Sequence, residues 1–477
     1  MIVTSRIKTR ILSLAFNGLL VDYSNKSKQN TILDRIHNEQ KAYNPVMDDE
    51  RLVSVPSYWN WSRLAYLTYN HGQTIPIDDF CYIDVGTLDN VHHRLAAKEN
   101  HVTAKEAPSR ARKIIEFEDV LYSTVRPYLH NICIVDKEFS KTPIASTAFC
   151  VMHARKEVLL YKFLFYWLLT SEFDKYSNGD PSKGALYPAI GEKDLLNGVI
   201  PVPSIEEQAL IVERIDAAFS ALDTIDTLQS QYQDNLATLK SKIIDAGIQG
   251  KLTEQLPEDG TAEKLYQQIQ QEKRKVLVMR GGREDKSIKP IEDDVPYILP
   301  PTWKWIRFGD IGLFKKGPFG SALTKSMFVP KSDTTIKVYE QQHAINKNKN
   351  LGTYYITKKY FDEKMRGFEV CPGDVIISCA GTIGETYIMP DDIEQGIINQ
   401  ALMRVTIVPS IDKKFFQLFF DARLKRNAQS QSNGSAINNI PPFEVLKNWY
   451  FPLPPLAEQK RIVAKLDELL PLCERLK

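Results

Sequence analysis

His92, His93 and His101 form the one close group of histidines in this 477-residue chain, and imidazoles can bind metal ions. No paired acidic or cysteine ligand lies near these histidines at the spacing of a helix or a hairpin. The six cysteines contain no Cys-x-x-Cys pair, which argues against a zinc module and favours a reducing compartment. We therefore expect solvated loop histidines and no metal site.

Two other stretches resemble catalytic motifs but depart from them at a required position. GTIGET at 381–386 lacks the lysine of the G-x-x-x-x-G-K-[ST] loop that cradles nucleotide phosphates. In NIPPF at 439–443, an isoleucine interrupts the Asn-Pro-Pro-aromatic motif of adenine methyltransferases, so we interpret the prolines as loop residues. We expect a chain with no catalytic residues that performs no bond-making chemistry itself.

The stretch FKKGPFGSALTKSMF at 314–328 is suited to binding a polyanion. Lysines neutralise phosphates, hydroxyl groups position a strand, and glycines allow a close approach. Ordinary solvated loop is the alternative interpretation. The candidate contacts here are Lys315, Lys316, Phe319, Ser321, Thr324 and Lys325.

Further polar loops add candidates for contacts to base edges. STVRPYLHN at 123–131 leaves a predicted strand, and its first serine matches a serine of GDVIIS at 373–378. Two glycine-bearing loops, at 177–190 and 428–442, carry Asn, Gln, Ser and Lys side chains that can read bases. The candidates are Ser123, Arg126, Tyr128, Asn178, Ser182, Lys183, Tyr187, Ser378, Thr382, Asn433 and Ser435.

An internal repeat must position these loops. PVPSIEEQALIVERIDAAF at 201–219 nearly copies PLPPLAEQKRIVAKLDELL at 452–470, with a Glu-Gln pair before an apolar-periodic helix. VPSYWNWSRL at 55–64 matches LPPTWKWIRF at 299–308, two tryptophans opposite two. A third match joins 8–20 to 240–252. The chain is therefore two copies of one unit.

Residues 204–250 are predicted to form one long helix, because apolar residues recur at spacings of three and four. The two chain ends repeat its parts, so we expect both ends to form helices antiparallel to it. This seam includes Ile7, Ile11, Leu14, Tyr232, Leu239 and Cys473. The residues expected to pack the spacer helices or dock partners are Ile211, Ile215, Leu222, Ile225, Leu236, Ile462, Leu466 and Leu469.

The fold class that follows is mixed α/β, with two strand-rich recognition domains separated by long antiparallel, coiled-coil-like helices and a pseudo-twofold repeat. Each domain also has an aromatic helix, which is most simply core. The expected boundaries are 1–54 for the first part of the split helix with a linker, 55–203 and 299–455 for the recognition domains, 204–298 for the central helix with a charged linker, and 456–477 for the last part of the split helix.

Charge and hydropathy limit the partners. The formal net charge is only +2, so nucleic-acid contacts must come from local basic patches. The longest apolar run, VLLYKFLFYWLL at 158–169, contains a lysine and is too short to span a bilayer. With no recognisable signal peptide, we expect a cytoplasmic protein without a membrane partner.

The doubled P-[LV]-P-x-x-x-E-Q-x-x-I-V hinge, the two α/β segments and the helix repeat resemble the specificity subunit of type I restriction-modification systems. YIDVGTLDN at 82–90 and LYSTVRPYLHNICIV at 121–135 are also similar to stretches of that family. The resemblance implies a prokaryotic protein whose two recognition domains each read half of a split, asymmetric double-stranded DNA target.

The resemblance also implies the partners and cofactors. Two modification subunits would dock on the helices, bind S-adenosylmethionine and methylate adenine at N6. Restriction subunits, translocases with a nuclease, would use ATP and Mg²⁺. No cofactor is expected on this chain. The alternatives are a stand-alone DNA-binding protein, a decoy subunit without catalytic partners, or a self-contained methyltransferase with diverged motifs.

Overall fold

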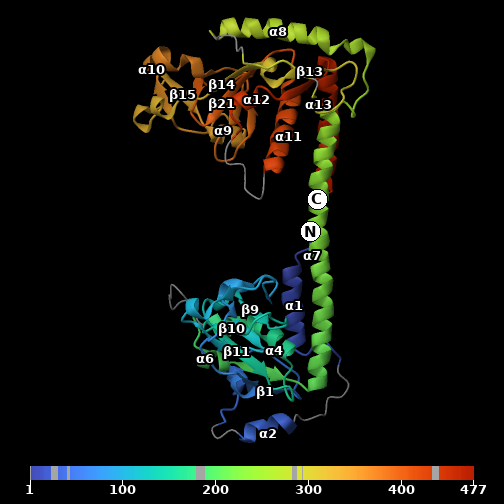
Figure 1. The fold of residues 1–477 in the computed structure, drawn as a ribbon, viewed down its shortest axis with the longest axis vertical. Coiled ribbons are helices and arrows are strands. Elements are labelled where there is room, and N and C mark those ends of the chain that lie inside the picture. The colour runs from blue at the N-terminus through green and yellow to red at the C-terminus, as the bar shows by residue number, and fades with distance from the viewer. Residues whose placement is uncertain are drawn as a thin grey trace. The chain divides into compact units, whose positions relative to one another are not determined.

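The computed structural model describes residues 2–22, 31–39, 43–178, 189–281, 287–292, 294–431 and 440–476 (Figure 1). The chain divides into two compact units, unit 1 (Met1–Gln231) and unit 2 (Tyr232–Lys477). The boundary falls inside the helix α7 (Ile205–Ile248), so each unit contains one part of that helix.

Unit 1 contains a small antiparallel sheet of β1 (Asn60–Arg63) and β12 (Val199–Val202), and two four-stranded sheets ordered β6-β3-β10-β7 and β2-β11-β8-β9. A hairpin joins β4 (Leu88–Asp89) to β5 (Arg94–Leu95). The remaining strands are β2 (Thr68–Tyr69), β3 (Phe80–Ile83), β6 (His101–Val102), β7 (Ala111–Ile114), β8 (Val120–Ser123), β9 (Ile132–Ile134), β10 (Pro143–Ser146) and β11 (Phe149–Ala154). The helices are α1 (Thr4–Phe16), α2 (Thr31–Glu39), α3 (Leu64–Leu67), α4 (Tyr161–Leu168), α5 (Ser171–Asn178) and α6 (Glu192–Leu196).

Unit 2 repeats these three sheets. Its small sheet pairs β13 (Lys304–Arg307) with β22 (Tyr450–Leu453), and the larger sheets have the orders β16-β15-β20-β17 and β14-β21-β18-β19. The larger sheets contain β14 (Gly312–Lys316), β15 (Thr335–Tyr339), β16 (Tyr355–Thr357), β17 (Glu369–Val370), β18 (Val375–Ser378), β19 (Thr386–Ile388), β20 (Gly396–Ile398) and β21 (Leu402–Ile407). The helices are α8 (Ala262–Met279), α9 (Gln341–Asn346), α10 (Lys358–Tyr360), α11 (Lys413–Gln431), α12 (Phe443–Leu446) and α13 (Leu456–Arg475). The mixed α/β class with a long helix between two sheet-rich domains is confirmed.

The repeated hinge joins the small sheet to the spacer helix through a buried glutamate. At the start of α7, Glu207 accepts hydrogen bonds from the Trp59 indole at 3.2 Å and the Tyr58 hydroxyl at 3.1 Å. At the start of α13, Glu458 accepts one from the Trp303 indole at 2.8 Å. These donors compensate the carboxylates for their loss of water, so the first tryptophan of each entry motif is bound to its own hinge.

The neighbouring glutamine ties the same hinge to the aromatic helix. The Gln208 side chain accepts from the Leu160 amide just before α4 and donates to the Pro203 carbonyl. Gln459 accepts from the Asp412 amide just before α11 and donates to the Pro454 carbonyl. Each glutamine is fully buried, so both ends of its amide need these partners.

The first chain end lies antiparallel to α7 in unit 1, as predicted. The Ile2 amide donates to Gln229 at 2.7 Å, and the Thr4 hydroxyl donates to Asp226 at 2.7 Å. Further along, Lys8 pairs with Asp223, so residue numbers rise on α1 as they fall on α7. Figure 1 shows α1 beside this part of α7.

The last chain end pairs with α7 in the same way in unit 2. The Tyr232 hydroxyl donates to the Leu476 carbonyl at 2.6 Å, and Lys240 forms an ion pair with Glu474. Near the hinge, Gly247 lies against Leu466, which is fully buried. The expected split of a second spacer helix between the two chain ends is therefore present, one part in each unit.

The predicted seam is wrong at several positions. Tyr232 and Leu239 on α7 are 45% and 42% exposed, and Ile7 on α1 is 39% exposed. On α1, the buried residues are Thr4, Leu12, Ala15 and Phe16, because this helix packs on α4 as well as on α7. Of the expected packing residues, Ile225 and Leu469 are half-buried, whereas Ile211, Ile215, Leu222, Leu236, Ile462 and Leu466 are buried.

The aromatic helices form the core of each unit. Phe16 lies 4.9 Å from Phe163 and 5.1 Å from Trp167 on α4, measured between ring centroids. In unit 2, Phe308 stacks on Phe416 and Phe420 of α11. These contacts agree with the expectation that the aromatic helices are core.

The charged linker after α7 contains a helix that packs on unit 2. This helix is α8, whose Ala262 and Ile269 are buried on unit 2. Lys273 donates to the Gly309 carbonyl at 2.8 Å, and Glu272 accepts from the Ser410 amide and hydroxyl. Hydrogen bonds and two buried side chains therefore anchor α8 to the rest of unit 2.

Substitution of Gly250, which follows α7, would test the close packing at the hinge. This glycine has a φ of +72°, and a Cβ there would lie 2.4 Å from the Pro300 side chain. We expect Gly250→Ala to lower the free energy of unfolding by about 2–4 kcal/mol, through backbone strain plus overpacking. The measurement is the denaturant midpoint of the full chain. Gly281→Ala is the matched control, because Gly281 also follows a helix (α8), has a similar φ of +61° and has open space around it. Equal losses in the two variants would contradict the packing argument.

Candidate nucleic-acid interface

In unit 1 the loop between β8 and β9 presents Arg126 and Tyr128 to solvent. Both side chains are exposed, Tyr128 by 50%. Ser123, at the end of β8, is buried, and its hydroxyl donates to the Val125 carbonyl at 2.9 Å. The serine thus supports the loop from inside, and the arginine and tyrosine lie on its outer side.

The same loop has an unusual backbone. Arg126 and His130 both adopt left-handed conformations with φ of 52°, which non-glycine residues seldom do. The His130 imidazole lies 2.8 Å from a carboxylate oxygen of Asp174 on α5. Strained residues held by tertiary contacts often mark functional loops, because the surrounding structure must enforce them.

Asp174 also joins this loop to the end of α5. The Asn178 side chain donates to the Asp174 carboxylate at 2.7 Å and to its carbonyl at 2.9 Å. Two predicted sites, around 126 and at Asn178, are therefore brought together by one carboxylate. Ser182, Lys183 and Tyr187, which follow α5, lie outside the described residues, as do Asn433 and Ser435 of unit 2.

In unit 2 the equivalent loop lies between β18 and β19. Ser378 is buried like Ser123, and its hydroxyl donates to the Thr382 carbonyl; the Thr382 side chain itself is exposed. Gly384, at φ +82°, passes so close to α11 that a Cβ would lie 2.0 Å from the Leu424 side chain. Burial raises the pKa of the adjacent Cys379 thiol to about 11, and nearby Lys316 opposes that shift.

The end of β14 lies near this loop and supplies the cations. Lys315 and Lys316 are exposed, and the Lys315 ammonium lies 4.7 Å from the centre of the Phe368 ring. Gly317 follows, where a Cβ would lie 1.8 Å from the Asn399 carbonyl oxygen, so only glycine allows this approach. Phe319 beyond it is 88% exposed.

The remaining candidates of this stretch are held by their own turn. Ser321 and Lys325 are exposed, and the half-buried Thr324 shares a hydrogen bond of 2.9 Å with the Ser326 hydroxyl. The exposed lysines and hydroxyls of 315–325 thus form one basic surface segment of unit 2.

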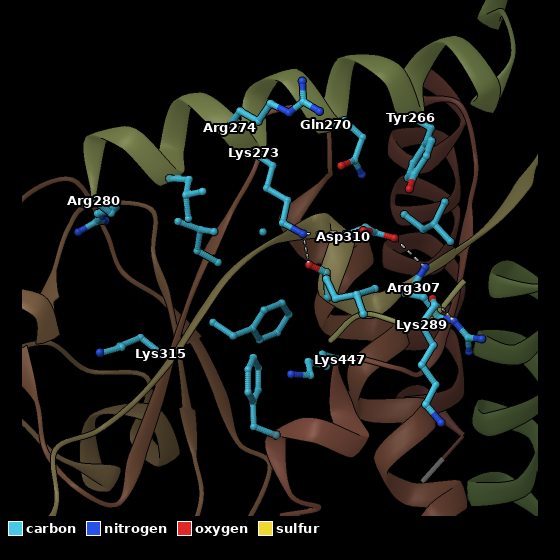
Figure 2. A pocket seen from close by; sticks show the side chains of 18 of the residues that line it. Tyr266, Gln270, Lys273, Arg274, Arg280, Lys289, Arg307, Asp310, Lys315 and Lys447 are labelled. Atoms are coloured by element: carbon cyan, nitrogen blue, oxygen red, sulfur yellow. Dashed lines mark hydrogen bonds and ion pairs between the residues drawn. The ribbon is translucent and has the colours of Figure 1, made fainter. Parts of the chain in front are cut away.

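A cavity of about 850 Å³ between α8 and the sheets of unit 2 adjoins Lys315 (Figure 2). Nine of its lining residues are Lys or Arg, and Asp310 is its one acidic residue. Most of these cations have protein partners: Arg307 donates to the Pro290 and Asn448 carbonyls, and Arg280 pairs with Asp374 at 2.9 Å. Burial raises the pKa of the Tyr266 hydroxyl to about 12, and the negative charge of Asp310 adds to this shift. The polar residues that line the cavity therefore mainly hold α8 in place, and Lys315 is one of the lining residues.

The histidines that the sequence analysis considered as metal ligands do not share a common site. His92 lies 2.7 Å from Asp89 and His101 lies 2.7 Å from Glu99, each within its own surface turn. The His92 contact lowers the pKa of Asp89 to about 2. Among the described residues, a different group does converge, namely His71, Asp119 and His153. Sequence spacing could not reveal it, because the three residues belong to separate elements.

The segment 158–169 that gave the longest apolar run forms part of the core through α4. Within the described ranges, none of the helices combines the length and apolar character that a bilayer crossing needs.

Known proteins resemble this chain over nearly its whole length. The family model "Type I restriction modification DNA specificity domain" matches residues 300–476. The EcoAI type I restriction enzyme specificity subunit of Escherichia coli is 21% identical, over 99% of this chain and 90% of its own length. The EcoEI specificity subunit of the same species is 25% identical, with the same coverage of each chain.

A solved structure has the same fold. It comes from work described as the structural basis underlying complex assembly and conformational transition of the type I R-M system. Its TM-score is 0.60 and its identity 23%, covering 88% of this chain and 92% of the other. The doubled hinge, the family model and the relatives that align with 99% of the chain agree with one another. Together they support the identification of the chain as a type I restriction-modification specificity subunit.

Proposed function

We propose that this chain reads a split, asymmetric DNA sequence, with each unit contacting one half. The observation that carries the proposal is the repeated three-sheet framework, which bears different loops at the same strand ends. Ser123 and Ser378 end equivalent strands, but Arg126 and Tyr128 follow one and a glycine-rich turn follows the other. Since different loops read different bases, a non-palindromic target follows.

In unit 2 the basic segment 315–325 would bind the DNA backbone. Lys315, Lys316 and Lys325 would neutralise phosphates, while Ser321 and Thr324 would position the strand. The exposed Phe319 ring offers apolar contact to a sugar or base. Thr382, and Asn433 and Ser435, would read base edges, with the buried Ser378 holding the loop in place.

In unit 1 the β8–β9 loop would play the corresponding role. Arg126 can donate two hydrogen bonds to a guanine edge or to a phosphate, and Tyr128 can pack on the backbone. Ser123 supports the loop, Asn178 is bound to Asp174 at the end of α5, and Ser182, Lys183 and Tyr187 would add further contacts to the DNA. The left-handed backbone at Arg126 supports a dedicated role for this loop.

Partner subunits would perform the chemistry. Two modification subunits with S-adenosylmethionine would methylate adenine, and restriction subunits with ATP and Mg²⁺ would translocate and cut DNA in the prokaryotic cytoplasm. The named function of the relatives, specificity, supports this division.

The docking surface for modification subunits is assigned to the exposed apolar residues of the spacer. Leu239 on α7 in unit 2 and Leu228 on α7 in unit 1 are 42% and 57% exposed. By contrast, Ile211 and Leu466 are buried inside their own units and serve packing. A partner that covers these leucines would remove their apolar surface from water, which favours association.

The function is tested by mapping N6-methyladenine in the genome of the host, with and without this gene. We expect deletion to remove a two-part methylated motif with a constant internal gap. An unchanged map would contradict the proposal if the modification subunit is expressed. A purified chain that binds S-adenosylmethionine would instead favour a self-contained methyltransferase, and tight split-site binding without a copurifying partner would favour a stand-alone or decoy protein.

Lys315 and Lys316 test the basic segment. Replacing both with Ala should weaken DNA binding nearly equally for all sequences, and the slope of log K against log salt should fall by about 2. Fluorescence anisotropy across a salt series gives both quantities. Lys358→Ala with Lys359→Ala is the matched control, because it removes the same charge from the exposed helix α10. An unchanged slope in the first variant would exclude the segment from the interface.

Leu239 tests the docking surface. Because Leu239 is exposed, Leu239→Asp should leave unit 2 folded and weaken assembly with the modification subunits by about tenfold or more. Copurification and binding titrations measure the loss. Ile298→Asp is the control, since Ile298 is 94% exposed and lies outside α7. Assembly of Leu239→Asp at the wild-type level would show that the anchor lies elsewhere.

A further inference from the structure

Three side chains of unit 1 converge at the start of β8. The β8–β9 loop, which we propose contacts DNA, lies at the other end of this strand. His71 Nε2 lies 3.1 Å and His153 Nδ1 lies 2.7 Å from the same carboxylate oxygen of Asp119. One ligand atom from each residue lies within 4.8 Å of the others. The Asp119 side chain is fully buried, and the two histidines are only 12% and 11% exposed.

The surroundings hold the carboxylate and one histidine in place. The second oxygen of Asp119 accepts a hydrogen bond of 2.7 Å from the Glu116 amide. The Glu116 carboxylate lies 3.5 Å from His71 Nδ1, which orients that imidazole with Nε2 toward Asp119. A carboxylate behind a histidine is the usual outer partner of a metal-binding imidazole.

Unit 2 has the same buried aspartate with different neighbours. Asp374 precedes β18 as Asp119 precedes β8, and accepts from the Cys371 amide at 2.7 Å. By strand register Thr406 occupies the position of His153, and its hydroxyl donates to Asp374 at 2.6 Å. The positive charge there comes from Arg280, whose guanidinium donates to both carboxylate oxygens.

A buried carboxylate needs a compensating charge or a full set of hydrogen bonds. In unit 2 a guanidinium supplies that charge permanently, whereas in unit 1 the neighbours are imidazoles. Among the described residues, no Lys or Arg side chain pairs with Asp119 as Arg280 pairs with Asp374, so that part of the chain supplies Asp119 with no permanent cation. A divalent ion on the same three atoms would provide one.

We propose that His71, Asp119 and His153 bind one divalent transition-metal ion, for which Zn²⁺ is the best match. Two imidazole nitrogens and one carboxylate oxygen are zinc ligands, and tetrahedral coordination needs ligand atoms about 3.3 Å apart. The distances to Asp119 would lengthen by about 0.2 Å from His71 and about 0.6 Å from His153, and the two imidazole nitrogens lie within 4.8 Å of each other. The site departs from the sequence expectation of no metal, and it lies apart from the β8–β9 loop.

The ion would cross-link three segments of unit 1. His71 follows β2, Asp119 precedes β8, and His153 lies on β11, the strand between them in the sheet. Three protein ligands leave a fourth position for water, so the site would be exchangeable. Its role would be structural, as a stabiliser of the sheet that carries the Arg126 loop.

The test uses the untagged full chain, treated with a chelator and then freed of it. Titration with Zn²⁺ alone should give one ion per chain and a thermal midpoint that rises with zinc concentration. Co²⁺ should give the visible spectrum of a tetrahedral nitrogen and oxygen site. His153→Thr, which copies the arrangement at Thr406, should keep the fold and weaken zinc binding at least tenfold, and His71→Ala should do the same.

His101→Ala is the matched control, because His101 also contacts a carboxylate, that of Glu99, and should leave the stoichiometry and affinity unchanged. Absence of a bound ion in the wild-type chain would overturn the proposal in favour of a hydrogen-bonded triad. Equal zinc affinity of wild type and folded His153→Thr would also overturn it, by placing the ion elsewhere.

Discussion

The buried Glu-Gln pair at the start of each spacer helix determines how the rest of each unit is arranged. Glu207 and Glu458 bind the tryptophan of the entry strand, and the adjacent glutamines bind the strand end and the start of the aromatic helix. One dipeptide thus orients three elements at once. Because each amide and carboxylate is buried, displacing any one element would leave polar groups unsatisfied, at a cost of about 1–3 kcal/mol per group.

A rigid hinge allows the loops to differ. Both units end an equivalent strand with a buried serine whose hydroxyl is bound to the following loop. From that common point, unit 1 turns through left-handed Arg126 and His130, and unit 2 turns through left-handed Gly381 and Gly384. At Gly384 a side chain would have to displace the Leu424 side chain, and the φ of +82° also favours glycine. The framework is therefore shared, while the surface that it presents is particular to each unit.

The sequence predicts best those features that are repeated along the chain or that follow a periodic pattern of apolar residues. The hinge, the doubled fold, α7 and its terminal counterparts follow from local patterns. The seam was wrong at Tyr232 and Leu239, because spacing shows which residues share a face but not whether a partner covers it. The charge of the linker after α7 does not reveal that α8 packs on unit 2. His71 and His153 are 48 and 34 residues from Asp119, so only tertiary structure brings them together.

Asp119 and Asp374 show how the two units solve one electrostatic problem differently. Unit 2 takes its countercharge from Arg280, directly after α8, so the linker helix becomes part of the recognition unit. In unit 1 the equivalent linker helix is α2, whose His37 contacts Ser62 at 2.8 Å and not Asp119. Among the described residues, the side chains that contact Asp119 are His153 on β11 and His71 after β2. A framework that keeps a buried carboxylate at the same turn in both units needs a countercharge or a full set of hydrogen bonds in both, and the groups that supply them differ between the units.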